Sequence, residues 1–171
     1  MEVALRDLSK LVPLGIVLVI VAVAVGWMLQ RDMTLGTWVF AAFLLGHGLV
    51  HIMFLAPPPT EPGSAVENFA FDPAKSWIVS SGFLSLTTLK VIVIGLVIAV
   101  VGGYALTALA TVGLIVPTAW WPGLLTASTV ISLALLAITP TPGLVLGVAI
   151  DFVLLWVANT AAWSPAGASA V

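Results

Sequence analysis

The chain of 171 residues is 61% hydrophobic and only 7% charged, with a formal net charge of −2 and no cysteine. A soluble domain carries roughly 25% charged residues, so this composition excludes a water-soluble fold. The small net charge excludes a basic surface for nucleic acid, and the lack of cysteine excludes disulfides, thiolate metal sites and thiol catalysis. Together with a mean hydropathy of +1.25, these properties predict an integral membrane protein embedded in a lipid bilayer.

Long apolar runs divide the chain. Because they are continuous and do not alternate as β-barrel strands do, they predict an all-α protein forming a single polytopic domain. A helix needs about 20 apolar residues to cross a bilayer. We therefore expect a bundle of five transmembrane helices, at residues 11–29, 35–56, 91–116, 120–138 and 143–163.

The first run follows Arg6 and Lys10, which is also typical of a secretory signal. It is longer than a typical signal core, so we interpret it as an uncleaved membrane anchor. A short turn at residues 30–34 leads into the second span, which ends at three consecutive prolines, residues 57–59.

The segment 57–90 contains the only long polar stretch and is expected to form a cytoplasmic loop. Asp72 followed by Pro73 predicts a helix start, because Asp suits the N-cap and Pro the first helical position. Residues 73–90 mix large apolar side chains with Ser and Thr, which predicts an interfacial or re-entrant helix. Alternatively, the segment could be the first half of a spanning helix. That arrangement would place Lys90 deep in the bilayer, where inserting its charge costs about 2.5–3.5 kcal/mol.

The third span carries a small residue at every fourth position: Gly95, Ala99, Gly103, Thr107 and Thr111. Such a row lets another helix approach closely. Five spans would place four basic residues, Arg6, Lys10, Lys75 and Lys90, on the N-terminal side, and only Arg31 opposite. The positive-inside rule then predicts a cytoplasmic (inner) membrane protein with its N-terminus in the cytoplasm and its C-terminus outside.

The two histidines, His47 and His51, lie four residues apart in the second span, so a helix presents both on one face. Asp151 is an acid well inside the fifth span, and such residues are usually paired or functional. At 1.5 Å per residue, His47 and Asp151 lie about 13 and 12 Å from the cytoplasmic ends of their spans. Thr129 and Ser132 lie at similar depth. We therefore predict one polar layer formed by His47, Asp151, Thr129 and Ser132.

This layer has four interpretations. It could simply hold helices together through hydrogen bonds. His47, His51 and Asp151 could bind zinc or iron and leave one position open, although Gly48 stands where a zincin has its Glu. Haem would need one His with a Met, or two protomers, because one helix face cannot supply both axial ligands. A His beside an intramembrane Asp also suits a proton or solute pathway.

The tiny loops and close-packing rows favour a non-catalytic accessory or structural subunit, acting as a homo-oligomer or with other membrane subunits. We expect no enzymatic activity. The alternative is a metal- or haem-binding protein, or a proton-coupled transport protein, that uses the His/Asp cluster.

Overall fold

The computed structural model describes residues 33–56, 72–138, 142–160 and 165. Within these ranges every regular element is a helix, which agrees with the all-α prediction. Three helices, Leu35–Leu55, Leu86–Val112 and Thr118–Ile138, are long and apolar enough to cross a membrane. The predicted first span, 11–29, and residues 57–71 of the predicted loop lie outside the described residues.

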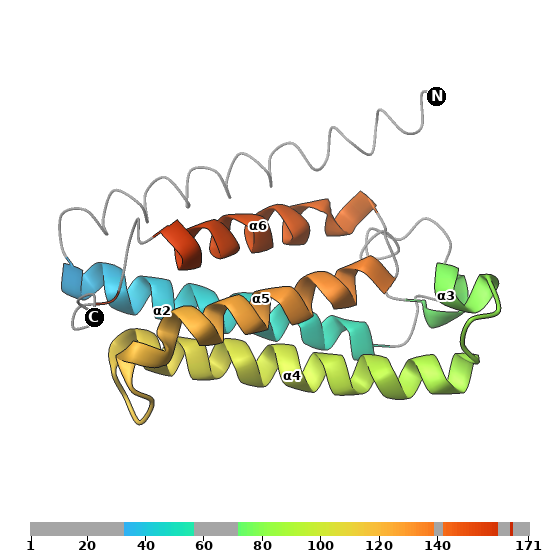
Figure 1. Ribbon diagram of the computed structural model, residues 1–171, viewed down its shortest axis with the longest axis horizontal. Helices are drawn as coiled ribbons and strands as arrows, with labels where there is room; N and C mark the ends of the chain where they lie inside the picture. Colours follow the sequence, from blue (N-terminus) through green and yellow to red (C-terminus); the bar gives the residue numbers. More distant parts are fainter. Residues whose placement is uncertain (1–32, 57–71, 139–141, 161–164, 166–171) are drawn as a thin grey trace.

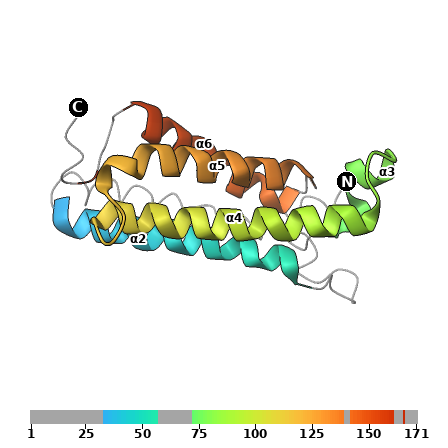
Figure 2. The same cartoon turned by 60° about the horizontal axis from the view of Figure 1, so that its bottom comes forward.

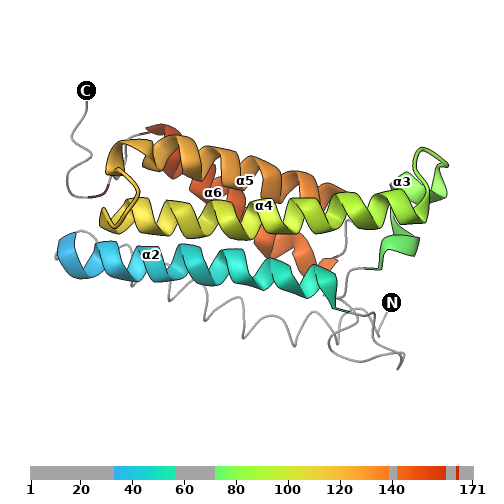
Figure 3. The same cartoon turned by 90° about the horizontal axis from the view of Figure 1, so that it is seen from below.

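In the order α2, α4, α5 and α6, each long helix runs antiparallel to the one before it (Figure 1). Helix α2 (Met33–Val50) continues into the 3-10 helix η1 (His51–Leu55) and is followed by α4 (Leu86–Val112). The 3-10 helix η3 (Thr118–Trp120) then leads into α5 (Trp121–Ile138), and η4 (Pro142–Leu144) leads into α6 (Val145–Thr160). Helix α2 packs against α4, α4 against α5 and α5 against α6. Figures 2 and 3 show α4 lying between α2 and α5.

Helix α2, together with η1, coincides with the predicted second span, and helix α5 coincides with the predicted fourth span. Of the helix expected at 143–163, the structure describes η4 and the 16 residues of α6, and residues 161–163 lie outside the described residues. At 1.5 Å per residue α6 is about 24 Å long, less than a hydrocarbon core of about 30 Å. It is apolar, but it falls below the length of the three candidate spans.

The single helix predicted over 73–90 is wrong. The structure has η2 (Pro73–Lys75), a short helix α3 (Trp77–Ser80), a turn and then the start of α4 at Leu86. Gly82 makes that turn with a φ of +77°, a left-handed conformation that glycine adopts without strain. The helix predicted as the third span therefore begins five residues earlier than expected, and Lys90 lies exposed in its second turn.

Helix caps explain these boundaries. Asp72 accepts a hydrogen bond from the amide of Ala74, which confirms the helix start expected at Asp72 and Pro73. Ser85 accepts one from Thr88 at 3.1 Å and begins α4. Gly113, with a φ of +69°, ends α4 at Val112, four residues before the predicted end. The serines read as an interfacial surface therefore include helix caps.

Ser76 and Trp77, which precede α4, cap the C-terminal end of α5. The hydroxyl of Ser76 donates to the carbonyl of Ile138 at 2.7 Å, and the indole of Trp77 donates to the carbonyl of Ala137 at 2.8 Å. The last carbonyls of a helix have no partner within the helix. These two bonds therefore satisfy the end of α5 and hold the start of α4 against it.

Two glycines allow the helices of the bundle to approach closely. A Cβ on Gly48 would lie 2.7 Å from Cβ of Tyr104, and a Cβ on Gly103 would collide with Ser128. In the small-residue row of α4, Gly103, Thr107 and Thr111 point into the bundle, while Gly95 and Ala99 are exposed. Among the described residues, only the second half of the predicted row is therefore used for packing.

We expect Gly48→Ala to lower the free energy of unfolding by about 1–3 kcal/mol, because the new methyl group overpacks the α2–α4 contact. Gly46→Ala is the matched control, since a Cβ there meets nothing within 4 Å. It should be neutral or slightly stabilising, because alanine is the better helix former. Thermal unfolding in detergent measures both, and equal stability of the two variants would contradict the observed contact.

Candidate functional site

Asp151 is completely buried in the middle of α6. Leu154, one turn later, is also buried, whereas Phe152 and Val153 are exposed. The helical period thus turns the carboxylate into the bundle. A carboxylate in an apolar interior must be paired or fully hydrogen-bonded, so its neighbours define the candidate site.

Side chains from three other helices surround this carboxylate. Oδ1 of Asp151 lies 2.9 Å from Nε2 of His47 on α2. The same oxygen accepts a hydrogen bond of 2.8 Å from the hydroxyl of Tyr104 on α4. Oδ2 lies 2.6 Å from the hydroxyl of Ser132 on α5. One carboxylate therefore links α6 to α2, α4 and α5.

A second layer of hydrogen bonds extends the cluster. Nε2 of His51 lies 2.8 Å from Oγ of Ser132, and Nδ1 of His51 lies 3.0 Å from the carbonyl oxygen of His47. The hydroxyl of Tyr104 lies 3.2 Å from Oγ1 of Thr129, which itself donates to the carbonyl of Leu125. Ser132 is thus the bridge between His51 and Asp151.

Aromatic rings enclose the two imidazoles. Phe43 stacks on His47 with 6.0 Å between ring centroids, and Phe54 stacks on His51 at 5.9 Å. Tyr104 meets His47 edge-on at 5.1 Å. These rings surround the polar groups with apolar atoms, and a low local dielectric strengthens satisfied hydrogen bonds while making unsatisfied ones costly.

The structure brings the four residues of the predicted polar layer into one cluster. His47 and Ser132 contact Asp151 directly, and Thr129 joins through Tyr104. Tyr104 was missed, although it is the only tyrosine of the chain and stands in the middle of an apolar run. A buried tyrosine hydroxyl usually needs a hydrogen-bond partner, so this isolated residue was the available signal.

The three predicted metal ligands do not converge on a common point. Both ring nitrogens of His51 are directed elsewhere, one to Ser132 and one to the carbonyl of His47. Across the described ranges, no group of three or more His, Cys, Asp or Glu could hold a metal ion. The geometry therefore offers hydrogen-bond and proton chemistry here, and a zinc or iron site has no ligand set among these residues.

Comparisons with protein-family models, with curated proteins and with solved structures found no match for this chain. Its function is therefore inferred from the contacts of the cluster itself. These contacts join a carboxylate, two imidazoles, a phenol and two hydroxyls. Such groups can hold helices in register and can hold or pass protons.

Tyr104→Phe should lower the free energy of unfolding by roughly 1–2 kcal/mol, because Asp151 loses the hydrogen bond from the Tyr104 hydroxyl. Thr107→Val provides a matched control on α4. The hydroxyl of Thr107 is also buried but bonds only to the carbonyl of Gly103 in its own helix. Unfolding in mixed micelles compares the two, and an equal loss in both would mean that the bonds between helices contribute nothing special.

Proposed function

We propose that this chain is a non-catalytic structural or accessory subunit of a membrane assembly, in which the Asp151 cluster sets the packing of the helices. The observation that supports this most directly is the carboxylate of Asp151, which contacts side chains of three other helices. Each interhelical hydrogen bond in a membrane contributes about 0.6 kcal/mol on average. Several such bonds converging on one residue favour a single register over alternatives in which helices slide or rotate.

The proposal includes five membrane spans. Three candidate spans are present in the described residues, and we assign the remaining two to residues 11–29 and to the segment 143–163 that contains α6. The short length of α6 can be matched by local thinning of the bilayer. The balance of basic residues supports a cytoplasmic N-terminus, an outside C-terminus and residence in the cytoplasmic membrane.

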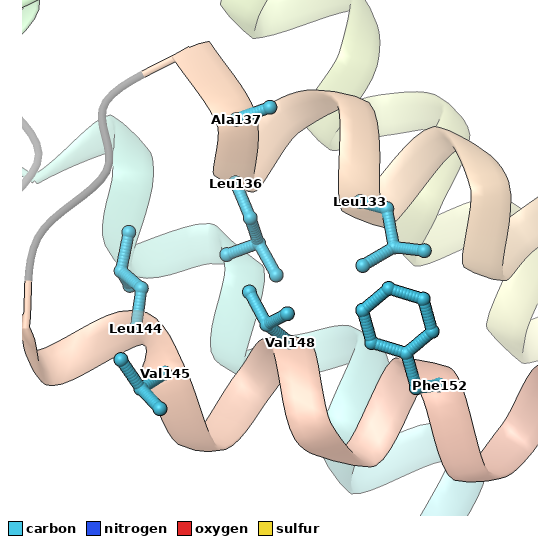
Figure 4. A pocket seen from close by; sticks show the side chains of 7 residues that line it. All are labelled: Leu133, Leu136, Ala137, Leu144, Val145, Val148 and Phe152. Atoms are coloured by element: carbon cyan, nitrogen blue, oxygen red, sulfur yellow. The ribbon is translucent and has the colours of Figure 1, made fainter.

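The outer surface of the bundle suits lipid, further copies of the chain or other membrane subunits. A groove of about 340 Å³ between α5 and α6 is an example (Figure 4). The side chains that line it are all apolar: Leu133, Leu136, Ala137, Leu144, Val145, Val148 and Phe152. None of the cluster residues lines this groove or the pocket near Lys90 at the start of α4. A separation between the polar cluster and these surface hollows favours a structural role for the cluster.

Proton-coupled transport is the second candidate. The chain of contacts from His51 through Ser132 to Asp151 favours it, because groups in hydrogen-bond contact can pass protons. Transport would additionally require movement of protons or solute from one side of the membrane to the other. This requirement separates the two candidates experimentally.

Proteoliposomes with an imposed pH gradient and an internal pH-sensitive dye test the structural proposal. The wild-type protein should leave the gradient as long-lived as in protein-free liposomes. If the wild type dissipates the gradient and Asp151→Asn abolishes that dissipation, transport would replace the structural proposal.

The structural proposal also predicts that Asp151→Ala lowers the free energy of unfolding by about 3–5 kcal/mol, because it leaves buried partners without an acceptor. Ser128→Ala is the control, since its buried hydroxyl bonds only to Leu124 of its own helix.

A further inference from the structure

Ser132 has two polar contacts but only one hydrogen to donate. Its Oγ lies 2.8 Å from Nε2 of His51 and 2.6 Å from Oδ2 of Asp151. A serine hydroxyl donates once and accepts at its lone pairs. One of the two contacts must therefore be made with a hydrogen that comes from His51 or from Asp151.

The state of His51 is constrained from its other side. Its Nδ1 lies 3.0 Å from the carbonyl oxygen of His47, which can only accept a hydrogen bond. Nδ1 therefore carries a hydrogen. In a neutral imidazole the remaining nitrogen, Nε2, is then an acceptor. A neutral His51 and an ionised Asp151 would thus present two acceptors to one hydroxyl hydrogen.

Burial makes that conflict costly. Ser132 and Asp151 are 0% exposed and His51 is 3% exposed. With both neighbours acting as acceptors, one contact would place two lone pairs against each other at hydrogen-bond distance. A polar atom left unsatisfied in a buried site costs about 1–3 kcal/mol, and more if it is charged. One additional proton removes the conflict.

We infer that His51, Ser132 and Asp151 together form a proton-binding site, which holds one proton more than a neutral imidazole, a hydroxyl and an ionised carboxylate would hold. This inference goes beyond the structural function proposed above, since it assigns a ligand, the proton, to the cluster.

The bound proton has two arrangements with the same total charge. In the first, the imidazolium Nε2–H of His51 donates to Ser132, and the Ser132 hydroxyl donates to the ionised Oδ2 of Asp151. In the second, the N–H bond of His51 and the O–H bond of Ser132 have broken. The proton from His51 is now bonded to Oγ of Ser132, and this hydroxyl donates a hydrogen bond to Nε2 of the neutral imidazole. Asp151 carries the former serine proton and donates a hydrogen bond to Oγ of Ser132. Two protons have moved and no electrons have been transferred.

The other titratable groups that face the site, among the described residues, leave the hydrogen count at Ser132 unchanged. Helix α2 supplies His47 and α4 supplies Tyr104, and both contact Oδ1 of Asp151. Helix α5 contributes only the hydroxyls of Ser132 and Thr129. The described lysines, Lys75 and Lys90, are exposed. An uncompensated carboxylate inside a membrane is expensive, and one bound proton brings the three-residue site to zero net charge.

A proton on His47 would also compensate the charge of Asp151, but it would leave the conflict at Ser132. The two possibilities differ in which residue is protonated. The primary test is therefore nuclear magnetic resonance of the wild-type protein in nanodiscs at pH 7.5, with ¹⁵N-labelled histidine and ¹³C-carboxyl-labelled aspartate. His47→Gln, His51→Gln and Asp151→Asn samples assign the signals.

Two results support the inference: a doubly protonated His51 with ionised Asp151, or a protonated Asp151 with His51 protonated only at Nδ1. An ionised Asp151 beside a singly protonated His51 overturns it, including the case in which His47 carries two protons. In Ser132→Ala the His51 and Asp151 signals should shift. Ser128→Ala should leave them unchanged, because the Ser128 hydroxyl contacts neither residue.

Unfolding as a function of pH gives an independent test. In an unfolded chain histidine has a pKa of about 6.5 and aspartate of about 3.9, so the extra proton is absent above about pH 7. The folded protein binds more protons there, and its stability falls as pH rises until the folded site releases the proton. The unfolding equilibrium constant should increase about tenfold per pH unit over that window, and should level off below about pH 6.5.

Asp151→Asn is the discriminating variant for this measurement. Its amide can donate to Oγ of Ser132, which then donates to a neutral His51, so no additional proton is needed. Steric-trap unfolding in non-ionic micelles should show the tenfold dependence for the wild type and Ser128→Ala, and lose it for Asp151→Asn. An equal slope in wild type and Asp151→Asn would overturn the inference. If Asp151→Asn does not fold, the resonance measurement on the wild type decides alone.

Discussion

The need to satisfy one buried carboxylate constrains the whole bundle. Asp151 can be accommodated in an apolar interior only if both of its oxygens have hydrogen-bond partners. His47, Tyr104 and Ser132 provide them from three different helices. Because α2 and α6 are not among the closely packed helix pairs, the His47–Asp151 contact connects elements that backbone packing leaves apart. The register of all four long helices is thereby tied to one side chain.

Close packing makes this arrangement possible. Tyr104 reaches Asp151 from a helix that lies directly against α2, and the missing side chain of Gly48 provides the space. Gly103, next to Tyr104 in the chain, performs the same role toward Ser128 on α5. The glycines of the bundle therefore act on the polar cluster indirectly, by setting how near α4 lies to its two neighbours. A bulkier residue at either position would move the hydroxyl of Tyr104 or displace the helix that carries its partner.

The hydroxyl of Ser132 gives the cluster its chemical character. If every donor in the cluster had its own acceptor, the cluster would only hold the helices together. Ser132, however, contacts an imidazole nitrogen and a carboxylate oxygen at once. The number of hydrogens, not the number of contacts, then decides what the site contains. The cluster can therefore serve packing and proton binding together, because the same bonds that align the helices require the proton.

The sequence by itself predicted the all-α class, two apolar helices of membrane-spanning length with nearly correct ends, and Asp151 and His47 as candidate functional residues, since composition and long apolar runs are local properties of the chain. Only the tertiary structure decided that Tyr104 completes the carboxylate's shell, that Ser132 bridges to His51, and that the three predicted metal ligands do not converge. It also showed that the Ser and Thr residues near 76–88 include helix caps. Periodicity states which residues share a helix face, but the rotation and separation of neighbouring helices depend on contacts between residues about 50–100 positions apart.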